Sequence, residues 1–367
     1  METIIVSAIN IKNGGPLTIL KSCLSYLSHN LSSKYKIIVL VYDKRLLERL
    51  EHVEFIEFKK TTKLYLHKLY YEYYYFKKIS IKFKPYLWLS LNDVTPSVKA
   101  TLRVVYCHNP SPFYKCSFKE IMLDPKFYFF TLLYKFIYKI NIKKNSFIVV
   151  QQDWIRKKFS SMFKIDENKI IVSPPSIDNQ FKYFDIIKNV QDEKIFFYPA
   201  FPRVFKNFEI IGEAANILLS KSIVNFKIYL TINGFENSYA KYFFRKYKSI
   251  KNLSFIGLQS IEKIYEYYLL SDYLIFPSKL ETWGLPISEM KTFEKPIIVA
   301  DLPYAHETVG DYDKVLFFDP LNPKDLAETM IKAMSGKFNS NSLKPVNMPF
   351  AKGWNDLFNI LLTHSKN

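Results

Sequence analysis

Short apolar segments alternate with longer amphipathic segments along the chain, a pattern typical of βα units built around parallel sheets. A first series of strand-like runs comprises residues 3–8, 35–41, 53–58, 86–91, 103–107 and 146–150. A second series comprises residues 194–200, 226–232, 253–257, 273–277, 296–300 and 315–318. Helix-like stretches separate the runs, for example residues 17–30, 207–220 and 322–334. The pattern predicts two α/β domains, one after the other.

Two polar segments set the expected domain boundaries. Residues 173–193 begin with paired prolines, which resist regular structure, and continue with polar residues. Residues 335–347 are rich in serine and asparagine and predict a second linker. We therefore predict a first domain, an interdomain linker, a second domain, and a final linker with a helix, over residues 1–174, 175–193, 194–336 and 337–367.

The last apolar residues of the chain recur at helical spacing: Phe350, Trp354, Leu357, Phe358 and Leu361. One linker leads into the second domain and another leads out of it. We therefore expect the final helix to return to the first domain.

The composition is that of a folded protein with a basic surface. The chain has 367 residues, of which 49% are hydrophobic and 23% charged, which suits two packed domains rather than disorder. The formal net charge of +18 favours an anionic partner such as phosphate, nucleic acid or an acidic membrane surface. The abundance of lysine, isoleucine and asparagine is equally expected from an AT-rich genome, so charge alone identifies no partner.

The cysteines and the hydrophobic runs bear on location. Cys23, Cys107 and Cys116 are scattered and lack zinc-ligand spacing, which favours free thiols in a reducing cytoplasm over disulfides. The first residues lack the basic start and long apolar run of a signal peptide. No uncharged apolar run reaches the roughly 18 residues of a membrane span, so we expect no transmembrane helix.

Two carboxylates border a loop in the segment ETWGLPISE, residues 281–289. The strand-like run 273–277 precedes it, and Pro286 suits the first turn of a following helix. Glu281 precedes the loop, and Glu289 is expected in the first helical turn. Open α/β sheets bind ligands at the carboxyl ends of their strands, where a carboxylate can accept two hydrogen bonds from neighbouring sugar hydroxyls. The alternative is that Glu289 only complements the helix dipole and that Glu281 is solvated.

The residues around this pair resemble glycosyltransferase family 4. The spacing Glu281-x7-Glu289, followed by KPIIVADLPYAHE and VLFFDP, carries the resemblance over residues 278–320. The resemblance implies a GT-B fold, with two Rossmann-like domains facing across a cleft, and a retaining transfer from a nucleoside diphosphate sugar. It further implies that Glu289 holds the nucleotide ribose, that Glu281 lies beside the transferred sugar, and that the amides of Trp283, Gly284 and Leu285 contact sugar hydroxyls.

A phosphate site is expected after the strand-like run 194–200. Arg203 and Lys206 lie in a strand-to-helix turn, and two cations there suit a diphosphate. An ordinary solvated basic turn is the alternative. The turn resembles the family's arginine-lysine pair on the leaving diphosphate, although the arginine there often lies farther from the lysine. Lys206 is therefore the firmer assignment.

The first domain contributes two further candidates. Gly14 and Gly15 follow the opening strand and would let the backbone approach a phosphate or sugar closely, although a structural turn explains them equally well. Their spacing is not GxGxxG, so a dinucleotide oxidoreductase gains no support. His108 follows a strand end, where a lone histidine can be structural or functional. By resemblance it lies near the transferred sugar, whereas a turn or N-cap role is expected for Asp93.

No catalytic metal and no cofactor are expected. Asp311 and Asp313 have the DxD spacing of metal-dependent transferases, but they precede the strand-like run 315–318, in a predicted turn. Arg203, Lys206 and helix amides can neutralise a diphosphate without a cation.

Two segments, residues 59–88 and 119–144, mix aromatic rings with lysines. Aromatic residues at helical spacing indicate core packing, while the same mixture suits docking on an anionic membrane surface. Nucleic-acid binding by stacking is a third and less favoured interpretation.

These observations predict a metal-independent, hexosyltransferase-type glycosyltransferase. The donor is a nucleoside diphosphate sugar and the acceptor a glycan, expected to be lipid-linked, in the synthesis of O-antigen, capsule or exopolysaccharide. The expected location is the cytoplasm, with peripheral contact to the inner face of the membrane. The alternatives are a sugar-nucleotide epimerase of the same architecture and a non-enzymatic basic scaffold that binds membrane or RNA.

Overall fold

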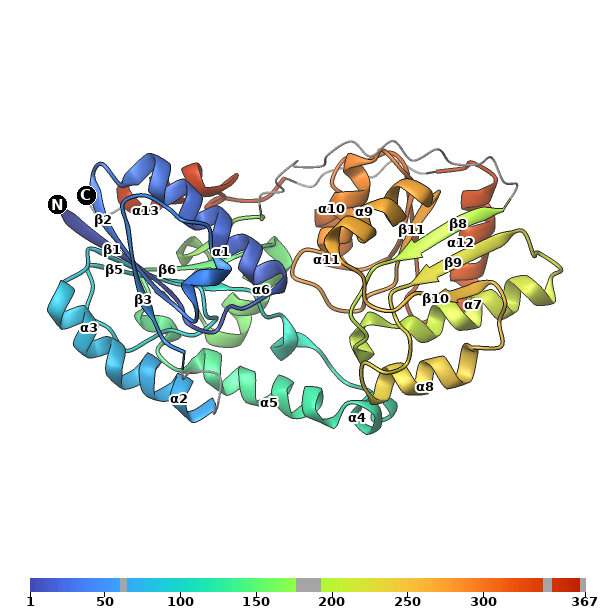
Figure 1. Ribbon diagram of the computed structural model, residues 1–367, viewed down its shortest axis with the longest axis horizontal. Helices are drawn as coiled ribbons and strands as arrows, with labels where there is room; N and C mark the ends of the chain where they lie inside the picture. The colour runs from blue at the N-terminus through green and yellow to red at the C-terminus, as the bar shows by residue number, and fades with distance from the viewer. Residues whose placement is uncertain (60–64, 176–192, 339–344, 364–367) are drawn as a thin grey trace. The chain divides into compact units, whose positions relative to one another are not determined.

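The computed structural model describes residues 1–59, 65–175, 193–338 and 345–363 (Figure 1). It divides into two compact units, each built around its own parallel sheet. The first comprises Met1–Phe113, Thr131–Ser176 and Val346–Asn367, and the second comprises Tyr114–Phe130 and Ile177–Pro345. Residues 176–192 of the predicted linker 175–193, and residues 339–344 and 364–367 of the segment predicted at 337–367, lie outside the described residues.

The first unit contains a seven-stranded sheet in the order β3-β2-β1-β4-β5-β6-β7. Its strands are β1 (Glu2–Ala8), β2 (Tyr35–Val41), β3 (Val53–Glu57), β4 (Leu87–Ser90), β5 (Leu102–Cys107), β6 (Phe147–Val150) and β7 (Ile170–Val172). The six strands expected from sequence are confirmed. The seventh has three residues, too few to give a readable pattern.

The helices of the first unit are α1 (Gly14–Tyr26), α2 (Tyr65–Tyr70), α3 (Phe76–Phe83), α6 (Asp153–Phe163) and α13 (Trp354–Thr363). A π-helical turn, Tyr71–Tyr75, joins α2 to α3. The helix α5 (Pro125–Lys139) begins in the second unit and ends in the first.

The second unit contains a six-stranded sheet in the order β10-β9-β8-β11-β12-β13. Its strands are β8 (Lys194–Tyr198), β9 (Phe226–Leu230), β10 (Leu253–Phe255), β11 (Tyr273–Phe276), β12 (Ile297–Ala300) and β13 (Val315–Phe318). Its helices are α4 (Phe118–Leu123), α7 (Phe208–Ser220), α8 (Ser238–Tyr247), α9 (Ile261–Leu270), α10 (Leu285–Thr292), α11 (Pro303–Val309) and α12 (Pro323–Met334). All six strands of the second series are confirmed.

Residues 114–130 precede the expected linker but pack with the second unit. The ring of Phe127 lies 5.0 Å from that of Phe205, and Lys279 forms an ion pair with Glu120. These contacts join α4 and the start of α5 to the second sheet. The sequence-based boundary at 174 placed this segment in the first domain, because a contact between residues this far apart leaves no local pattern.

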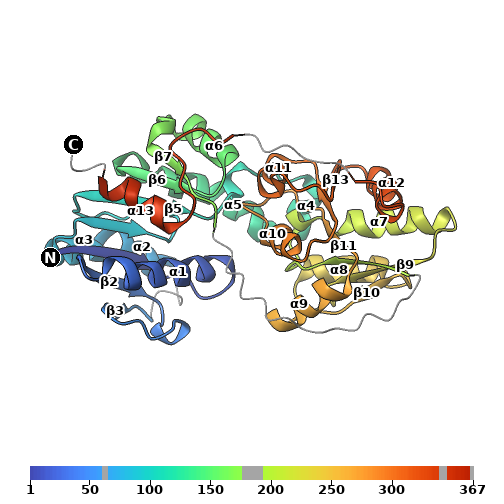
Figure 2. The ribbon, with the colours of Figure 1, turned by 90° about the horizontal axis from the view of Figure 1, so that it is seen from above.

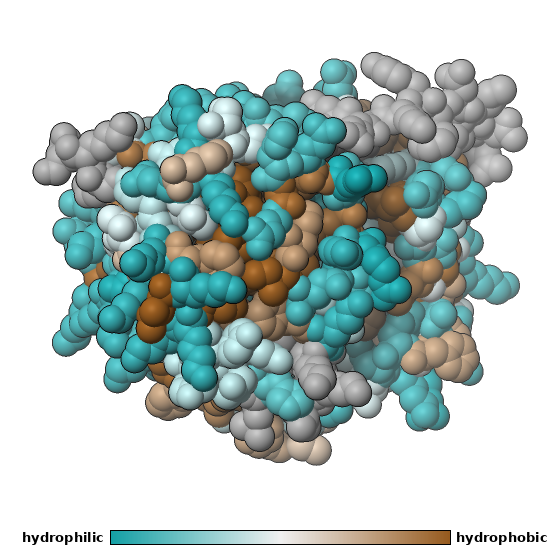
Figure 3. Space-filling view, turned by 60° about the vertical axis from the view of Figure 1, so that its left-hand side comes forward, coloured by the Kyte–Doolittle hydropathy of each residue, from teal (hydrophilic) through white to brown (hydrophobic). Residues whose placement is uncertain are grey.

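No helix within the described ranges is long and apolar enough to span a bilayer. Apolar side chains nevertheless reach the surface, and Figure 3 shows groups of them among hydrophilic residues on one face. The segment with the longest apolar run, α5, has 15 residues.

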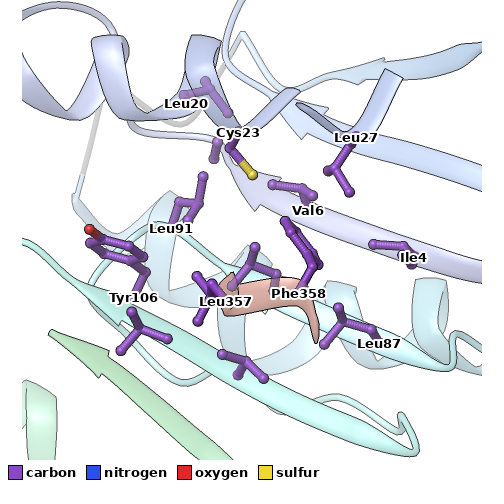
Figure 4. Close-up of a cluster of buried hydrophobic side chains, with 14 of the residues drawn as sticks. Ile4, Val6, Leu20, Cys23, Leu27, Leu87, Leu91, Tyr106, Leu357 and Phe358 are labelled. Carbon is purple, nitrogen blue, oxygen red and sulfur yellow. The ribbon is translucent and has the colours of Figure 1, made fainter. Parts of the chain in front are cut away.

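The final helix, α13, completes the core of the first unit, as expected (Figures 1 and 2). Leu357 and Phe358 lie among buried side chains of β1, β4 and α1 (Figure 4). The ring of Phe358 stacks on Tyr26 at 5.5 Å, and Trp354 Nε1 donates to Ser22 Oγ at 3.0 Å. Phe350 lies before the helix, in an isolated bridge with Val172, so the expected helix begins four residues later than its apolar spacing suggested.

Candidate active site

The candidate residues of the second unit follow two neighbouring strands at the centre of its sheet. β8 and β11 pair directly, and the strand order reverses between them, since β9 and β10 lie on one side and β12 and β13 on the other. Arg203 and Lys206 follow β8, and Glu281 follows β11. Open α/β sheets bind ligands where the strand order reverses, at the carboxyl ends of the strands. The topology therefore brings the predicted cations and carboxylates to one sheet edge.

Hydrogen bonds hold the two loops together. The main-chain N–H of Lys279 donates to the carbonyl of Phe205 at 2.7 Å. Tyr198, at the end of β8, donates its hydroxyl to the carbonyl of Lys206 at 2.8 Å, and Tyr304 donates to that of Ser278 at 2.7 Å. The positions of Lys206 and Glu281 are therefore fixed relative to one another by the surrounding backbone.

Lys206 and Glu281 form an ion pair between Nζ and Oε1. Their side chains are 18% and 14% exposed, so Glu281 is not solvated as the alternative interpretation proposed. The ammonium also lies 5.7 Å from the centre of the Phe276 ring. The pair is largely buried, so each charge depends on the other for its neutralisation.

Arg203 has a different partner. Its guanidinium lies 3.2 Å from Asp124 Oδ2, at the junction of α4 and α5, and the side chain is 46% exposed. Lys206 is thus the more enclosed of the two predicted phosphate ligands. Arg203 would have to leave Asp124, or share it, to bind a diphosphate.

Gly284 permits the turn that starts α10. Its φ is +84°, a conformation that strains residues with a side chain, and a Cβ there would lie 3.2 Å from Ile287 Cδ1 and 3.3 Å from a carbon of Phe276. The helix begins at Leu285 with Pro286 in its first turn, as expected. Gly284 adds no side chain at the start of α10, whereas Pro286 has no N–H to donate to a ligand there.

Both the side chain and the main chain of Trp283 form hydrogen bonds. Its indole Nε1 donates to Ser288 Oγ at 2.9 Å, and Thr308 Oγ1 donates to its carbonyl. The indole N–H is therefore already engaged, and a ligand contact at this residue would use the main chain.

Glu289 is the fifth residue of α10, not part of its first turn as the sequence suggested. This position weakens the alternative that it merely complements the helix dipole, which acts mostly within the first turn. Its Oε2 accepts a hydrogen bond from Tyr268 of α9 at 2.7 Å. Burial raises the pKa of Glu289, while the Tyr268 hydroxyl opposes that rise. Among the described residues a hydrogen bond is found for Oε2 alone, so Oε1 can accept a bond from a ligand hydroxyl.

The candidates of the first unit also lie at one sheet edge. Its strand order reverses between β1 and β4. Gly14, with φ of +68°, and Gly15 start α1 after β1, and His108 follows β5. The N–H of Asn10 donates to Asn92 Oδ1 at 3.3 Å, which joins the loops after β1 and β4.

Asp93 has a structural role, but its side chain anchors a distant loop rather than capping a helix or its own turn as expected. Its carboxylate accepts the main-chain N–H groups of His108 and Asn109, and the Tyr138 hydroxyl at 3.1 Å. The carboxylate of Asp93 therefore positions the backbone that carries His108.

His108 is partly exposed and stacks on Tyr106, with ring centres 4.6 Å apart. Both ring nitrogens are shielded from solvent, and neither has a hydrogen-bond partner of normal geometry among the described residues. Burial lowers the pKa of His108, and the Asp93 carboxylate only partly offsets this. The neutral ring has one donor and one acceptor, but neither nitrogen is open to a ligand in this conformation.

One polar cluster was missed in the sequence. Glu72 is fully buried, and Asn92 Nδ2 donates to its Oε1 at 2.8 Å. Burial raises the pKa of Glu72 to about 7, opposed by the nearby Lys68 ammonium. The sequence feature that could have indicated this cluster is that Glu72 is the only acidic residue between Lys59 and Trp88.

Asp311 and Asp313 lie in the turn between α11 and β13, where the sequence placed them. Across the described parts of the chain, no group of three or more His, Cys, Asp or Glu side chains is arranged to hold a metal ion. The DxD spacing in this turn therefore does not coincide with a metal-binding cluster.

The architecture is that of GT-B glycosyltransferases of known structure. The chain is similar to sucrose-phosphate synthase from Thermosynechococcus elongatus, with TM-score 0.67 and 13% identity over 91% of this chain and 90% of that one. It is similar to WaaG, a glycosyltransferase involved in lipopolysaccharide biosynthesis, with TM-score 0.64 and 15% identity over 90% of each chain. It is also similar to Anabaena HepE, solved in complex with UDP and glucose, with TM-score 0.62 and 15% identity over 91% and 90%. At such identities the likeness concerns the fold.

Residues 178–345 match the model of the family described as Glycosyl transferases group 1. The match spans just under half of the chain and includes each candidate residue of the second unit, from Arg203 to Glu289. A comparison with curated protein sequences finds no significant match. The fold is thus GT-B, and the second unit is similar to the group 1 glycosyltransferases.

Proposed function

We propose that the protein is a family 4 glycosyltransferase that moves a hexosyl or deoxyhexosyl group from a nucleoside diphosphate sugar to a glycan acceptor, with retention of configuration. The observation that carries the proposal is the placement of Lys206, Glu281 and Glu289 around the strand-order reversal of a sheet that matches group 1 glycosyltransferases. The structural likeness to HepE, solved with UDP and glucose, supports a nucleotide-sugar donor.

In this proposal Glu289 accepts hydrogen bonds from the ribose hydroxyls of the donor. Its burial and its bond from Tyr268 hold the carboxylate in one orientation, which favours recognition of a diol. The main-chain amides of residues 283–285 bind hydroxyls of the sugar, and Gly14 and Gly15 allow a close backbone approach on the donor side.

Lys206 stabilises the departing nucleoside diphosphate. Negative charge grows on the diphosphate as the bond to the sugar breaks, and a preorganised cation in a partly enclosed site stabilises that charge. When the diphosphate takes over Lys206, Glu281 loses its partner and can interact with the positive charge that develops on the sugar. Arg203 adds a second cation once it leaves Asp124. No metal and no cofactor are required by this scheme.

In this proposal His108 contacts a hydroxyl of the transferred sugar once a change in the surrounding loops exposes one of its ring nitrogens. Because its pKa is lowered by burial, the ring is neutral at ordinary pH and acts as a hydrogen-bond partner rather than a cation. Asp93 fixes its backbone but does not contact the substrate in this scheme.

The acceptor we propose is a lipid-linked glycan of a cell-surface polysaccharide, such as lipopolysaccharide or capsule, and the reaction is proposed to take place in the cytoplasm. The structural likeness to WaaG, which is involved in lipopolysaccharide biosynthesis, supports this setting. The free thiols of Cys23, Cys107 and Cys116 fit a reducing compartment.

A panel of UDP-, GDP- and dTDP-sugars tests the proposal. We expect one donor class to raise the melting temperature and to be hydrolysed slowly without acceptor, with release of the nucleoside diphosphate. Glu289→Ala should abolish binding of that donor, and the anomeric configuration of the product sugar reports retention. Failure of every donor to bind would refute the proposal, and an isomerised sugar nucleotide formed without acceptor would indicate an epimerase instead.

A further inference from the structure

The helix α5 carries apolar residues on two opposite sides. One side is buried in the protein and includes Phe127, Tyr134, Ile137 and Tyr138, each no more than 8% exposed. The other side reaches solvent. Its most exposed apolar residues are Phe129 (66%), Leu132 (46%), Leu133 (50%), Phe136 (66%) and Ile140 (43%). We call these five residues the outer stripe.

The outer stripe follows helical periodicity. Its members are spaced at i, i+3, i+4, i+7 and i+11 from Phe129, so they share one side of the helix. Ile140 follows the last helical residue, Lys139, directly. Single exposed apolar residues are ordinary on a protein surface, but a continuous row along one helix marks a surface that binds another apolar phase. The core packing of α5 uses the opposite side and does not account for this row.

Lysines border the outer stripe. At about 100° per residue, Lys126 lies at one edge of the row, and Lys135 and Lys139 lie at the other. All three are exposed, and α5 contains no aspartate or glutamate. Lys143 and Lys144, both exposed, follow the helix. The row is therefore apolar in its centre and cationic along its edges.

We propose that α5 docks the protein on an anionic lipid bilayer, with the outer stripe among the lipid chains and the bordering lysines at the head groups. A helix of 15 residues with interior lysines does not cross a bilayer, but it can lie in the interface plane. A second copy of the chain is a poorer occupant, because pairing two such faces would bring their lysines together. This docking rests on α5 alone and stands independently of the proposed transfer reaction.

Flotation of the full-length protein with lipid vesicles tests this docking. One set of vesicles contains phosphatidylcholine only, and the other contains a mixture of phosphatidylcholine and phosphatidylglycerol. We expect the protein to float with the mixed vesicles and to remain at the bottom with the neutral ones. Salt should weaken the association, since the lysine contribution is screened.

Two variants separate the apolar and charged contributions. Leu133→Gln/Phe136→Gln removes the centre of the outer stripe, and we expect at least a tenfold loss of partitioning onto mixed vesicles. Lys135→Gln/Lys139→Gln should reduce partitioning by roughly fivefold for each lysine and should flatten the salt dependence. The altered residues are exposed, so unchanged melting temperatures are expected and would exclude misfolding.

The matched controls are on the second unit. Phe235→Gln/Leu321→Gln removes two apolar side chains that are 91% and 79% exposed, and Lys241→Gln/Lys248→Gln removes two exposed lysines. Both controls should float as the unaltered protein does. Flotation that is lost equally in the controls, or retained in the outer-stripe variant, would overturn the proposal. So would a concentration-dependent dimer without lipid that the outer-stripe variant abolishes.

Discussion

Glu281 is paired with Lys206, so the carboxylate in the loop after β11 is neutralised by the cation in the loop after the neighbouring strand, β8. The carboxylate predicted to lie beside the sugar and the lysine predicted to bind the diphosphate therefore form an ion pair with each other before any ligand binds.

Lys206→Ala should lower kcat/KM by roughly 100- to 1,000-fold, because the variant loses the cation that stabilises the departing diphosphate. It should also weaken binding of the free nucleoside diphosphate, measured by calorimetry. The double variant with Glu281→Gln should lose less than the sum of the two single losses, because the residues act as a pair.

Lys279→Ala is the matched control for this substitution. Lys279 is another partly buried lysine with a carboxylate partner, Glu120. Its removal should cost similar thermal stability but leave nucleoside diphosphate affinity within about twofold, since Lys279 is assigned no diphosphate contact. Equal losses of affinity in both variants would show that the effect is structural.

Donor affinity should depend on the ionisation of Glu289. Burial raises the pKa of this carboxyl, so the acceptor form is present above the raised pKa and is lost as the pH falls through it. We expect affinity to fall on acidification at a pH higher than an ordinary glutamate would give. Glu289→Gln should bind weakly and without this pH dependence. A wild-type profile that the substitution leaves unchanged would remove Glu289 from the donor site.

Glu72 should make the first unit less stable as the pH rises. Its pKa is about 7 in the folded protein against 4.5 for the ordinary group, so between these values the folded state holds a proton that the unfolded state has released. The free energy of unfolding therefore falls across this window, by at most about 3 kcal/mol. Glu72→Gln keeps an acceptor for Asn92 and should be more stable than wild type at pH above 7. Urea unfolding at several pH values measures the difference, and the exposed Glu54→Gln serves as control.

Gly284→Ala should destabilise the second unit by about 1–3 kcal/mol and reduce donor binding. The added Cβ meets Ile287 and Phe276 at 3.2 and 3.3 Å and is strained at a φ of +84°. Gly336→Ala is the control, since its φ of +72° is similar but no atom lies within 4 Å of the added Cβ. Its cost should be about 1 kcal/mol, with donor binding unchanged. Thermal unfolding with and without donor distinguishes the two variants.

The sequence was informative wherever a residue's role depended on local pattern. The strands of both sheets are buried apolar runs, and Gly284 with Pro286 marks the start of α10 as expected. The contacts between distant residues left no such pattern. The Tyr268 bond to Glu289 spans 21 positions, and the Lys279 pair with Glu120 spans 159.

The buried cluster around Glu72 illustrates the same limit. The sequence shows Lys68 four residues before Glu72, but it does not show that the fold buries this acid against Asn92. The sequence likewise did not predict which side of α5 is exposed, because it shows two apolar faces but not which of them packs against the rest of the protein.

The return of α13 to the first unit has a consequence for synthesis on the ribosome. Leu357, Phe358 and Leu361 fill the core between β1 and α1, yet they follow every strand of the second unit in the chain. The apolar surface of the first unit that α13 covers therefore stays exposed until residues 354–363 have been translated. During that interval a chaperone would find its binding surface on the half of the protein that was made first.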